Sequence, residues 1–291
     1  MKRYKIAVCL SGQSRTWEEC VQSLKEFYND EDHDYYFFGH TWDQNEWKAS
    51  CLAHPIVEGL NAQLLHEAMD NEIGFTKLMV SPALDPFAAM HPDNKQFPYE
   101  ARTGIEDVAL HVKPWSWVSL FKSLMLANSL KTEYEMENDM KFDLVVRARF
   151  DLAYKPGTRF KDKIPGVFQH SFPNTLYCSP SHFPDEMFLP AINDLFYFGS
   201  SEVMDLVDSF YRSHHNGNFW KIIGADYYDS CYKQAGPNVL LWKWMSVKNV
   251  MPYAISAHDM VIVRRGYGTG NWPEDYEAYQ ESYSNPSFHQ K

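Results

Sequence analysis

The feature that most constrains the fold is an alternation of strand-like and helix-like segments through the first 150 residues. Short apolar runs, each stopped by polar, glycine or proline residues, alternate with segments whose apolar residues return at helical spacing. Strands are predicted at residues 4–10, 35–40, 77–80 and 142–150, and helices at 17–28, 62–69 and 115–134. This order predicts an α/β fold, in which a mainly parallel central sheet has helices on both faces.

The second half of the chain has a less regular pattern. Residues 84–113 show no clear period and are expected to form a long irregular loop, while residues 156–190 are rich in proline and aromatic residues. Further elements are expected as a strand at 195–198, helices at 202–211 and 225–234, and a polar tail after 266. Because neither a repeat nor a low-complexity linker is visible, the 291 residues are expected to form one domain.

Composition excludes several classes of protein. A hydrophobic content of 45% with 16% aromatic residues is enough for a large core, despite a net charge of −11. The acidic balance disfavours nucleic acid and anionic membranes as general partners. No run of about 18 apolar residues is present, and the chain enters a strand almost at once, so neither a membrane span nor a signal peptide is expected.

The cysteines argue against a stabilising disulfide framework. Five are present, widely separated and without a C-x-x-C pair: Cys9, Cys20, Cys51, Cys178 and Cys231. An odd number at such spacing is not typical of a disulfide-rich domain or a zinc knuckle. A reducing, cytoplasmic location is therefore the prediction.

The loop after the first strand is a candidate anion site. Residues 11–16 read SGQSRT and place backbone N–H groups, hydroxyls and one guanidinium before a helix. Ser11, Gly12 and Arg15 are the candidate ligand-binding residues. The segment is neither a P-loop nor a G-x-G-x-x-G fingerprint. The alternative is an ordinary strand-to-helix turn with Thr16 as the N-cap.

The sharpest motif is a group of charges at the end of the mid-chain strand. Arg147, Arg149 and Asp151 follow a buried apolar run, at the edge where open α/β sheets usually bind ligands. Charges at such a place are costly to bury unless they are paired. Either the three neutralise one another, or the arginines bind phosphate and Asp151 binds a cation.

Four short segments in this order resemble a known family. They are CLSGQSRTW (9–17), FFGHTWD (37–43), VVRARFDL (145–152) and NDLFYFGSSEVMD (193–205). Their order resembles nucleotide-sugar-dependent glycosyltransferases of the GT-A type, in particular polysaccharide-synthesis and virus-encoded members with R-x-R-x-D-L in place of D-x-D. The resemblance implies a Rossmann-like GT-A fold, with a nucleotide-binding half (1–152), an acceptor-side half (153–265) and a tail (266–291).

The resemblance also implies an activity and a cofactor. The expected reaction is hexosyltransferase-like transfer of a sugar from a UDP- or GDP-linked donor to a hydroxyl of a glycan or polysaccharide. Mn²⁺ or Mg²⁺ would bind the donor diphosphate through Asp151 and His258. Arg149 stands where the first D-x-D carboxylate would be, so a metal-independent enzyme stays open, as does an inactive relative that only binds nucleotide or glycan. A glycoside hydrolase explains the arginines poorly, because it has no diphosphate to hold.

The remaining candidates come from the same resemblance. Asp226 is the expected general base, with Asp229 in reserve, although acidic residues in first helical turns are common as caps. Asp194, next to Asn193, is expected at the donor or acceptor sugar hydroxyls. Aromatic and basic residues complete the predicted site, although most aromatic residues belong to cores. Trp42 is expected at the nucleobase, Trp220 at the acceptor and Lys122 at phosphate.

Overall fold

The computed structural model describes the greater part of the chain, in seven ranges. These are residues 3–43, 61–83, 114–164, 174–180, 192–215, 237–255 and 260–262. The predicted loop at 84–113, the predicted helix at 225–234 and the tail after 266 lie outside them.

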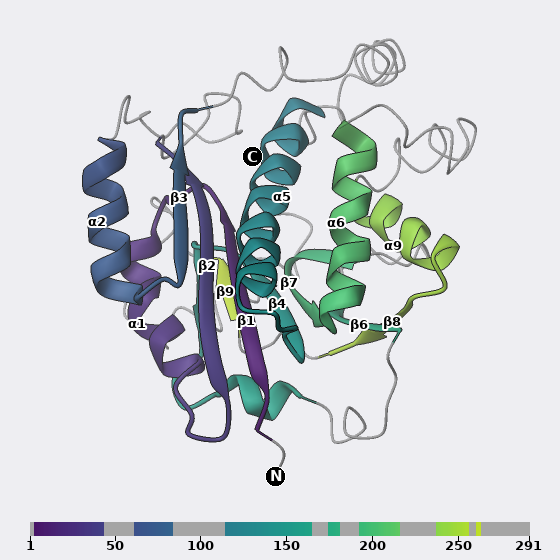
Figure 1. Cartoon of the computed structure of the whole chain (residues 1–291), viewed down its shortest axis with the longest axis horizontal. Coiled ribbons are helices and arrows are strands. Elements are labelled where there is room, and N and C mark those ends of the chain that lie inside the picture. Colours follow the sequence, from purple (N-terminus) through teal and green to yellow (C-terminus); the bar gives the residue numbers. More distant parts are fainter. Residues whose placement is uncertain are drawn as a thin grey trace, which may run out of the picture.

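The described residues form a seven-stranded central sheet (Figure 1). Its strands are β1 (Lys5–Gly12), β2 (Asp34–Trp42), β3 (Lys77–Ser81), β4 (Leu144–Ala148), β6 (Thr175–Pro180), β7 (Ile192–Gly199) and β8 (Met251–Ala254). The spatial order is β3-β2-β1-β4-β7-β6-β8. Only β7 runs antiparallel to its neighbours in this sheet. The predicted mainly parallel sheet is therefore confirmed.

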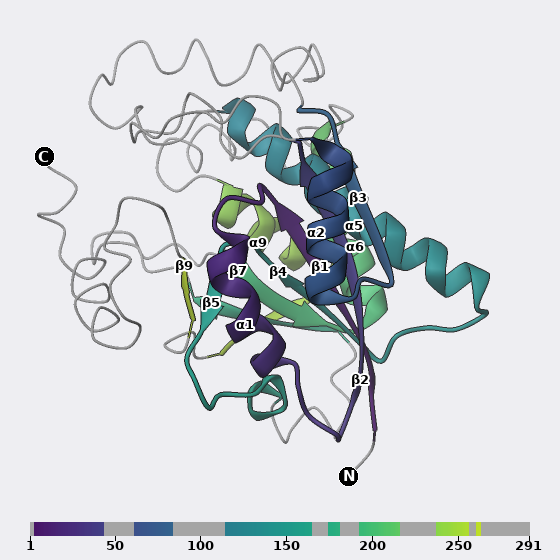
Figure 2. The same ribbon diagram turned by 90° about the vertical axis from the view of Figure 1, so that its left-hand side faces the viewer.

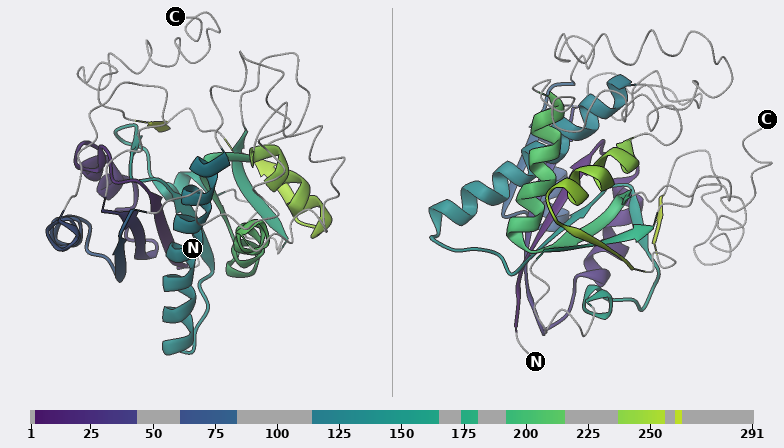
Figure 3. Two further views of the ribbon diagram at one scale, coloured as in Figure 1. Left: turned by 90° about the horizontal axis from the view of Figure 1, so that it is seen from above. Right: turned by 90° about the vertical axis from the view of Figure 1, so that its right-hand side faces the viewer.

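Helices cover both faces of this sheet, as predicted (Figure 3). The helices are α1 (Trp17–Phe27), α2 (Ala62–Ile73), α5 (Pro114–Glu137), α6 (Ser201–His215) and α9 (Pro237–Val247). Residues of α5, α6 and α9 form one apolar core on the first face, and residues of α1 and α2 belong to a second core on the other. None of the described helices is long and apolar enough to cross a bilayer.

Apolar periodicity explains why α1 forms where it does. Trp17, Cys20, Leu24 and Phe27 are its buried residues, spaced by three or four positions, so they share one side of the helix. Phe27 also stacks on Tyr154 with ring centroids 4.0 Å apart. The packing of α1 therefore fixes the helix against the chain that follows β4.

A second, two-stranded sheet extends this side of the molecule (Figure 2). It pairs β5 (Leu152–Tyr154) with β9 (Met260–Ile262) in antiparallel register. The 3₁₀ helix η1 (Phe160–Lys163) follows β5 and buries Phe160 completely. Because β5 begins directly after Asp151, the small sheet and α1 together anchor the segment that leaves β4.

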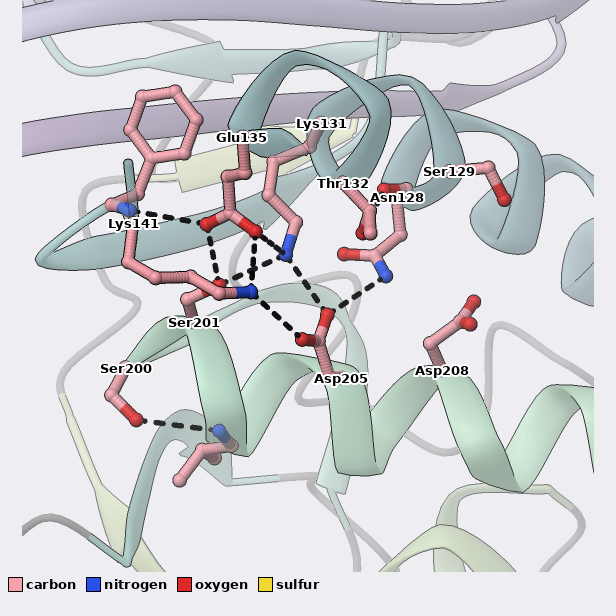
Figure 4. A network of polar contacts seen from close by, with 12 residues as sticks. Asn128, Ser129, Lys131, Thr132, Glu135, Lys141, Ser200, Ser201, Asp205 and Asp208 are labelled. Atoms are coloured by element: carbon pink, nitrogen blue, oxygen red, sulfur yellow. Dashed lines mark hydrogen bonds and ion pairs between the residues drawn. The ribbon is translucent and has the colours of Figure 1, made fainter. Parts of the chain in front are cut away.

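A buried ionic network joins α5 to α6 on the first face (Figure 4). The fully buried Lys131 ammonium donates to Glu135 Oε2 (3.2 Å), Ser201 Oγ (2.9 Å) and Asp205 Oδ1 (2.9 Å). Ser201 Oγ donates to the other Glu135 oxygen (2.7 Å), and Lys141 approaches Glu135 Oε2 at 2.8 Å. Breaking such a network leaves a buried charge without compensation, so it specifies how the two helices pack.

The described cysteines agree with the absence of a disulfide framework. Cys9, Cys20 and Cys178 are buried free thiols. Burial raises the pKa of Cys9 and of Cys178 to about 12, so both thiols are protonated at neutral pH. They pack as small apolar side chains.

Candidate functional site

Strand order places the candidate site between β1 and β4. The chain runs from β1 outward to β2 and β3 on one side, while β4 lies against the other side of β1. Open α/β sheets bind ligands at the carboxyl ends of the strands at such a reversal, and this edge between β1 and β4 is the candidate crevice. The register pairs Cys9 with Arg147 and Leu10 with Ala148. The two motifs singled out in the sequence therefore meet at one edge.

The first loop has an unusual backbone. Gly12 has a φ of +121°, a region that L side chains rarely adopt, and its N–H donates to Ser123 Oγ on α5 (2.8 Å). Arg15 has a φ of +38° although it is not a glycine. Thr16 does occupy the N-cap position of α1, but its side chain makes no capping hydrogen bond. This strain is stored next to the crevice, as is common at functional sites.

Arg149 and Asp151 form an ion-pair network with Arg15. Arg149 donates from Nε to Asp151 Oδ1 and from Nη2 to Oδ2, both at 2.7 Å. Arg15 donates from Nη1 to Asp151 Oδ2 (3.1 Å) and from Nε to Gln13 (2.9 Å). The Asp151 side chain is only 2% exposed. Arg149 and Asp151 therefore neutralise each other, as in the first of the two alternatives that the sequence left open.

Arg147 lies apart from this network, on the opposite face of β4. Val145, two residues earlier, belongs to the core beneath α5 and α6, and side chains two apart on a strand share a face. Arg147 is 2% exposed, and none of its three guanidinium nitrogens has a hydrogen-bond partner within the described ranges. Its described aromatic neighbour is Tyr197, whose ring centroid is 5.6 Å from the guanidinium carbon. A cation–π contact offsets only part of the cost of burying a charge.

A second buried polar atom without a partner lies on the same face. Ser11 is fully buried, and its Oγ makes no hydrogen bond to the described residues. It follows Cys9 by two positions on β1, and Cys9 is the register partner of Arg147. A hydroxyl and a guanidinium, both unsatisfied, thus lie on the α5 side of adjacent strands near the edge. Buried polar groups of this kind normally have a partner.

His40 joins three strand ends to α5. Its Nδ1 lies 2.8 Å from Ser123 Oγ and its Nε2 lies 3.1 Å from Ser81 Oγ. Ser123 Oγ donates to the His40 carbonyl (3.0 Å) and accepts from Gly12, so the network assigns the proton of the ring to Nδ1. Burial, with a smaller effect of the Lys122 charge, lowers the pKa of His40 to about 3. The ring is therefore neutral at physiological pH.

This junction was not singled out from the sequence. No role is assigned to His40 from the sequence, and its partner Ser123 lies 83 residues away in the chain. The signal that was available is a histidine at the polar end of an apolar strand. Finding its partner required the packing of α5 over β1 and β2.

Two further predicted residues lie beside the junction. Trp42 ends β2 and is buried, with its ring perpendicular to that of His40 and the centroids 4.8 Å apart. Lys122 is half-buried on α5, next to Ser123. Their predicted contacts with nucleobase and phosphate stay predictions.

The other predicted residues are not placed relative to this edge. Asp226, Asp229, Trp220 and His258 lie outside the described residues. Asp194 belongs to β7, but its side chain is outside the described part, as is that of Asn193.

The described residues do not by themselves fit a divalent-cation site. Mg²⁺ and Mn²⁺ prefer oxygen ligands, above all carboxylates. Asp151 already accepts three hydrogen bonds from the guanidinium groups of Arg15 and Arg149. In the described ranges no group of three His, Cys, Asp or Glu residues lies close enough together to hold a metal. The chemistry proposed for this chain therefore includes no metal step.

Comparisons with known proteins give a distant structural likeness. No protein-family model and no curated protein sequence matches the chain. Among solved structures, the chain is similar to mouse xyloside xylosyltransferase 1 in its apo form, with 9% sequence identity and a TM-score of 0.40. That match covers 96% of this chain and 93% of the other. The α/β assignment rests on the strand order and register given above.

Proposed function

We propose that the chain is a nucleotide-sugar-dependent glycosyltransferase, which moves a sugar from a nucleoside-diphosphate donor to a hydroxyl of a glycan or polysaccharide. The observation that carries this proposal is the buried guanidinium of Arg147, which has no counter-charge among the described residues. It lies one residue before the end of β4, at the reversal of strand order. An anionic ligand in the crevice would supply the missing partner.

A diphosphate matches the Arg147 guanidinium better than a carboxylate or a neutral sugar does. A guanidinium presents planar, paired N–H donors that match two phosphate oxygens. The net charge of −11 means that the field of the whole protein repels anions, so a local cation has to hold them. Ser11, with its unsatisfied hydroxyl on the same face, adds a donor for a further oxygen. The resemblance of the R-x-R-x-D-L segment to glycosyltransferases supports a sugar-linked nucleoside diphosphate as this anion.

The proposed reaction exchanges one bond at the anomeric carbon for another, and three residues of the chain would assist it. The acceptor hydroxyl oxygen forms a bond to the anomeric carbon, the bond from that carbon to the donor phosphate oxygen breaks, and the nucleoside diphosphate leaves with the electron pair. Arg147 would stabilise the charge that develops on the departing diphosphate. Asp226 is proposed to accept the hydroxyl proton, and Asp194 to orient sugar hydroxyls.

The remaining predicted roles belong to the same proposal. Trp42 would contact the nucleobase and Lys122 the phosphates. Arg15 and Arg149 would act from the rim of the crevice while they hold Asp151. Dependence on Mn²⁺ or Mg²⁺ through Asp151 and His258 is not part of this proposal and stays a prediction of the resemblance, tested by comparing activity in excess Mn²⁺ with activity in EDTA.

A binding-only relative is the second candidate. The observation that favours it is Asp151, whose carboxylate is committed to two arginines. Such a protein would bind nucleotide or glycan without turnover. It differs from an enzyme in one measurable respect, which is the release of product.

Release of nucleoside diphosphate from a panel of UDP- and GDP-sugars tests the proposed function. The assay is run with water alone and with a broad panel of glycan acceptors, because some transferases hydrolyse their donor slowly. Release that is lost in Arg147→Met supports the glycosyltransferase. Donors that bind but give no release under any condition support the binding-only relative, and donors that neither bind nor react contradict the glycosyltransferase and a relative that binds nucleotide.

A further inference from the structure

A groove on the outer side of α5 and α6 has the properties of a second binding site. Its volume is about 570 Å³, and it is an open groove lined by residues of α5 and α6 together with one residue of β3. Its walls are largely apolar, and Met79 and Met136 are exposed there, at 37% and 75%. Pockets that bind small molecules have volumes of this order and apolar walls with a few polar groups.

One polar atom in this groove lacks a partner. Asp208 is 6% exposed, and its Oδ1 makes no hydrogen bond to the described residues. Its Oδ2 accepts from Arg212 Nε at 2.5 Å. The carboxyl group projects from α6 toward Asn128 and Ser129 on α5 (Figure 4). The neighbouring donors are in use, since Arg212 also donates to Ser129 and Asn128 donates to Asp205.

The ion pairs at and beside the groove contain more carboxylates than cations. The described ion pairs here join five carboxylates to four cations, which leaves one negative charge. The carboxylates are Glu133, Glu135, Glu137, Asp205 and Asp208, and the cations are Lys77, Lys131, Lys141 and Arg212. Burial raises the pKa of Asp208, against the opposing effect of Arg212, as expected for a carboxylate that lacks donors.

We propose that this groove binds a small organic cation, with a primary ammonium that donates to Asp208 Oδ1 and an apolar chain along the methionine and leucine side chains. An ammonium supplies the donor that Asp208 Oδ1 lacks. Its charge offsets the surplus negative charge where Lys77 faces both Glu133, which lines the groove, and Glu137. Leu126, Leu130, Met79 and Met136 provide the apolar contact for the chain. Methionine side chains adapt their shape to such ligands. This site is independent of the proposed glycosyl transfer, whose crevice meets α5 at Ser123.

Methionine-methyl NMR with n-hexylamine as the probe tests the proposal. The signals of Met79 and Met136 are assigned by Met79→Leu and Met136→Leu, and both should shift at millimolar amine. Met251 is 59% exposed on β8 and serves as the internal control, whose signal should not move. n-Hexanol and n-hexanoate have the same chain without the positive charge and should bind at least about tenfold more weakly.

Two variants separate the specific carboxylate from general charge. Asp208→Asn should weaken amine binding about tenfold or more, while Glu202→Gln, an exposed residue of the same helix that does not line the groove, should not. If Asp208→Asn fails to fold, the comparison of amine with alcohol on the wild type decides alone. Equal shifts with amine and alcohol, shifts of all three methionines together, or none at all would overturn the proposal.

Discussion

Replacing Arg147 by methionine should make the empty protein more stable while it removes donor binding. Methionine keeps most of the length of the side chain but removes a buried charge that has no hydrogen bond within the described ranges. A buried ion costs several kcal/mol of folding free energy, and a desolvated cation–π contact such as that with Tyr197 returns about 2 kcal/mol at most. We therefore expect the free energy of unfolding to rise by about 1 to 3 kcal/mol.

The size of the thermal effect follows from chain length. An unfolding entropy of about 2.1 cal/mol/K per residue gives about 0.6 kcal/mol/K for 291 residues, so a gain of about 2 kcal/mol raises Tm by about 3 °C. Urea denaturation without ligand measures the same change in free energy. Loss of a charged hydrogen bond worth about 2 kcal/mol should weaken nucleoside-diphosphate binding about 30-fold.

Arg149→Met is the matched control for this prediction. Its guanidinium donates two hydrogen bonds to the buried Asp151, so its removal should lower the free energy of unfolding by about 1 to 3 kcal/mol. The two variants thus change stability in opposite directions, although the motif holds both arginines two residues apart. A loss of stability in Arg147→Met comparable to that in Arg149→Met would show that Arg147 is a structural residue and not one kept for a ligand.

Three further variants test other parts of the account. Lys131→Met should lower the free energy of unfolding, measured by urea denaturation, by about 3 kcal/mol, because it leaves the buried Glu135 short of a cation. Lys25→Met breaks an exposed ion pair and should lower it by less than about 1 kcal/mol. Similar losses in both variants would contradict the buried network. Burial lowers the pKa of His40 from 6.5 to about 3, so between pH 7 and pH 5 the imidazole takes up a proton in the unfolded chain but not in the folded one. The free energy of unfolding should therefore fall by about 2 kcal/mol from pH 7 to pH 5, and His40→Gln should reduce this fall. An unchanged fall in His40→Gln would contradict a neutral, buried His40. Asp226→Asn should lower turnover by about 100-fold at nearly constant donor affinity, and a variant as fast as the wild type would remove Asp226 from the role of base.

The sequence allowed prediction of strands whose apolar runs are bounded by polar, glycine or proline residues, whether buried like β1 or without a buried residue like β3. Residues 4–10 read as a buried strand, and β1 is indeed buried from Ile6 onward, although it continues to Gly12. Among the predicted elements that the structure describes, each strand and helix is present with shifted ends. The strands β5, β6, β8 and β9 and the helix α9 were not predicted. Most are short, and β6 lies in a segment whose prolines and aromatic residues obscure any period.

The sequence predicted two candidate motifs but not how their residues are arranged. It placed Ser11 and Arg147 each near the carboxyl end of a strand, and the register of β1 and β4 puts these strand ends side by side; ligand binding there stays a prediction. The separation of Arg147 from Arg149 depends on where β4 ends, because the alternation of faces applies only within the strand. A local motif also gives no sign of the contact between His40 and Ser123, since packing alone brings them together.

Calorimetric titration of the wild type with nucleoside diphosphates and the matching nucleosides measures whether the protein holds a diphosphate through Arg147. At least one diphosphate should bind, and at about 100 times its Kd it should add about 2.7 kcal/mol to the free energy of unfolding. The matching nucleoside should bind much more weakly, and Arg147→Met should lose most of the difference. A panel without binding, or equal affinity for nucleoside and diphosphate, would contradict a diphosphate held by Arg147 at the carboxyl edge of the sheet.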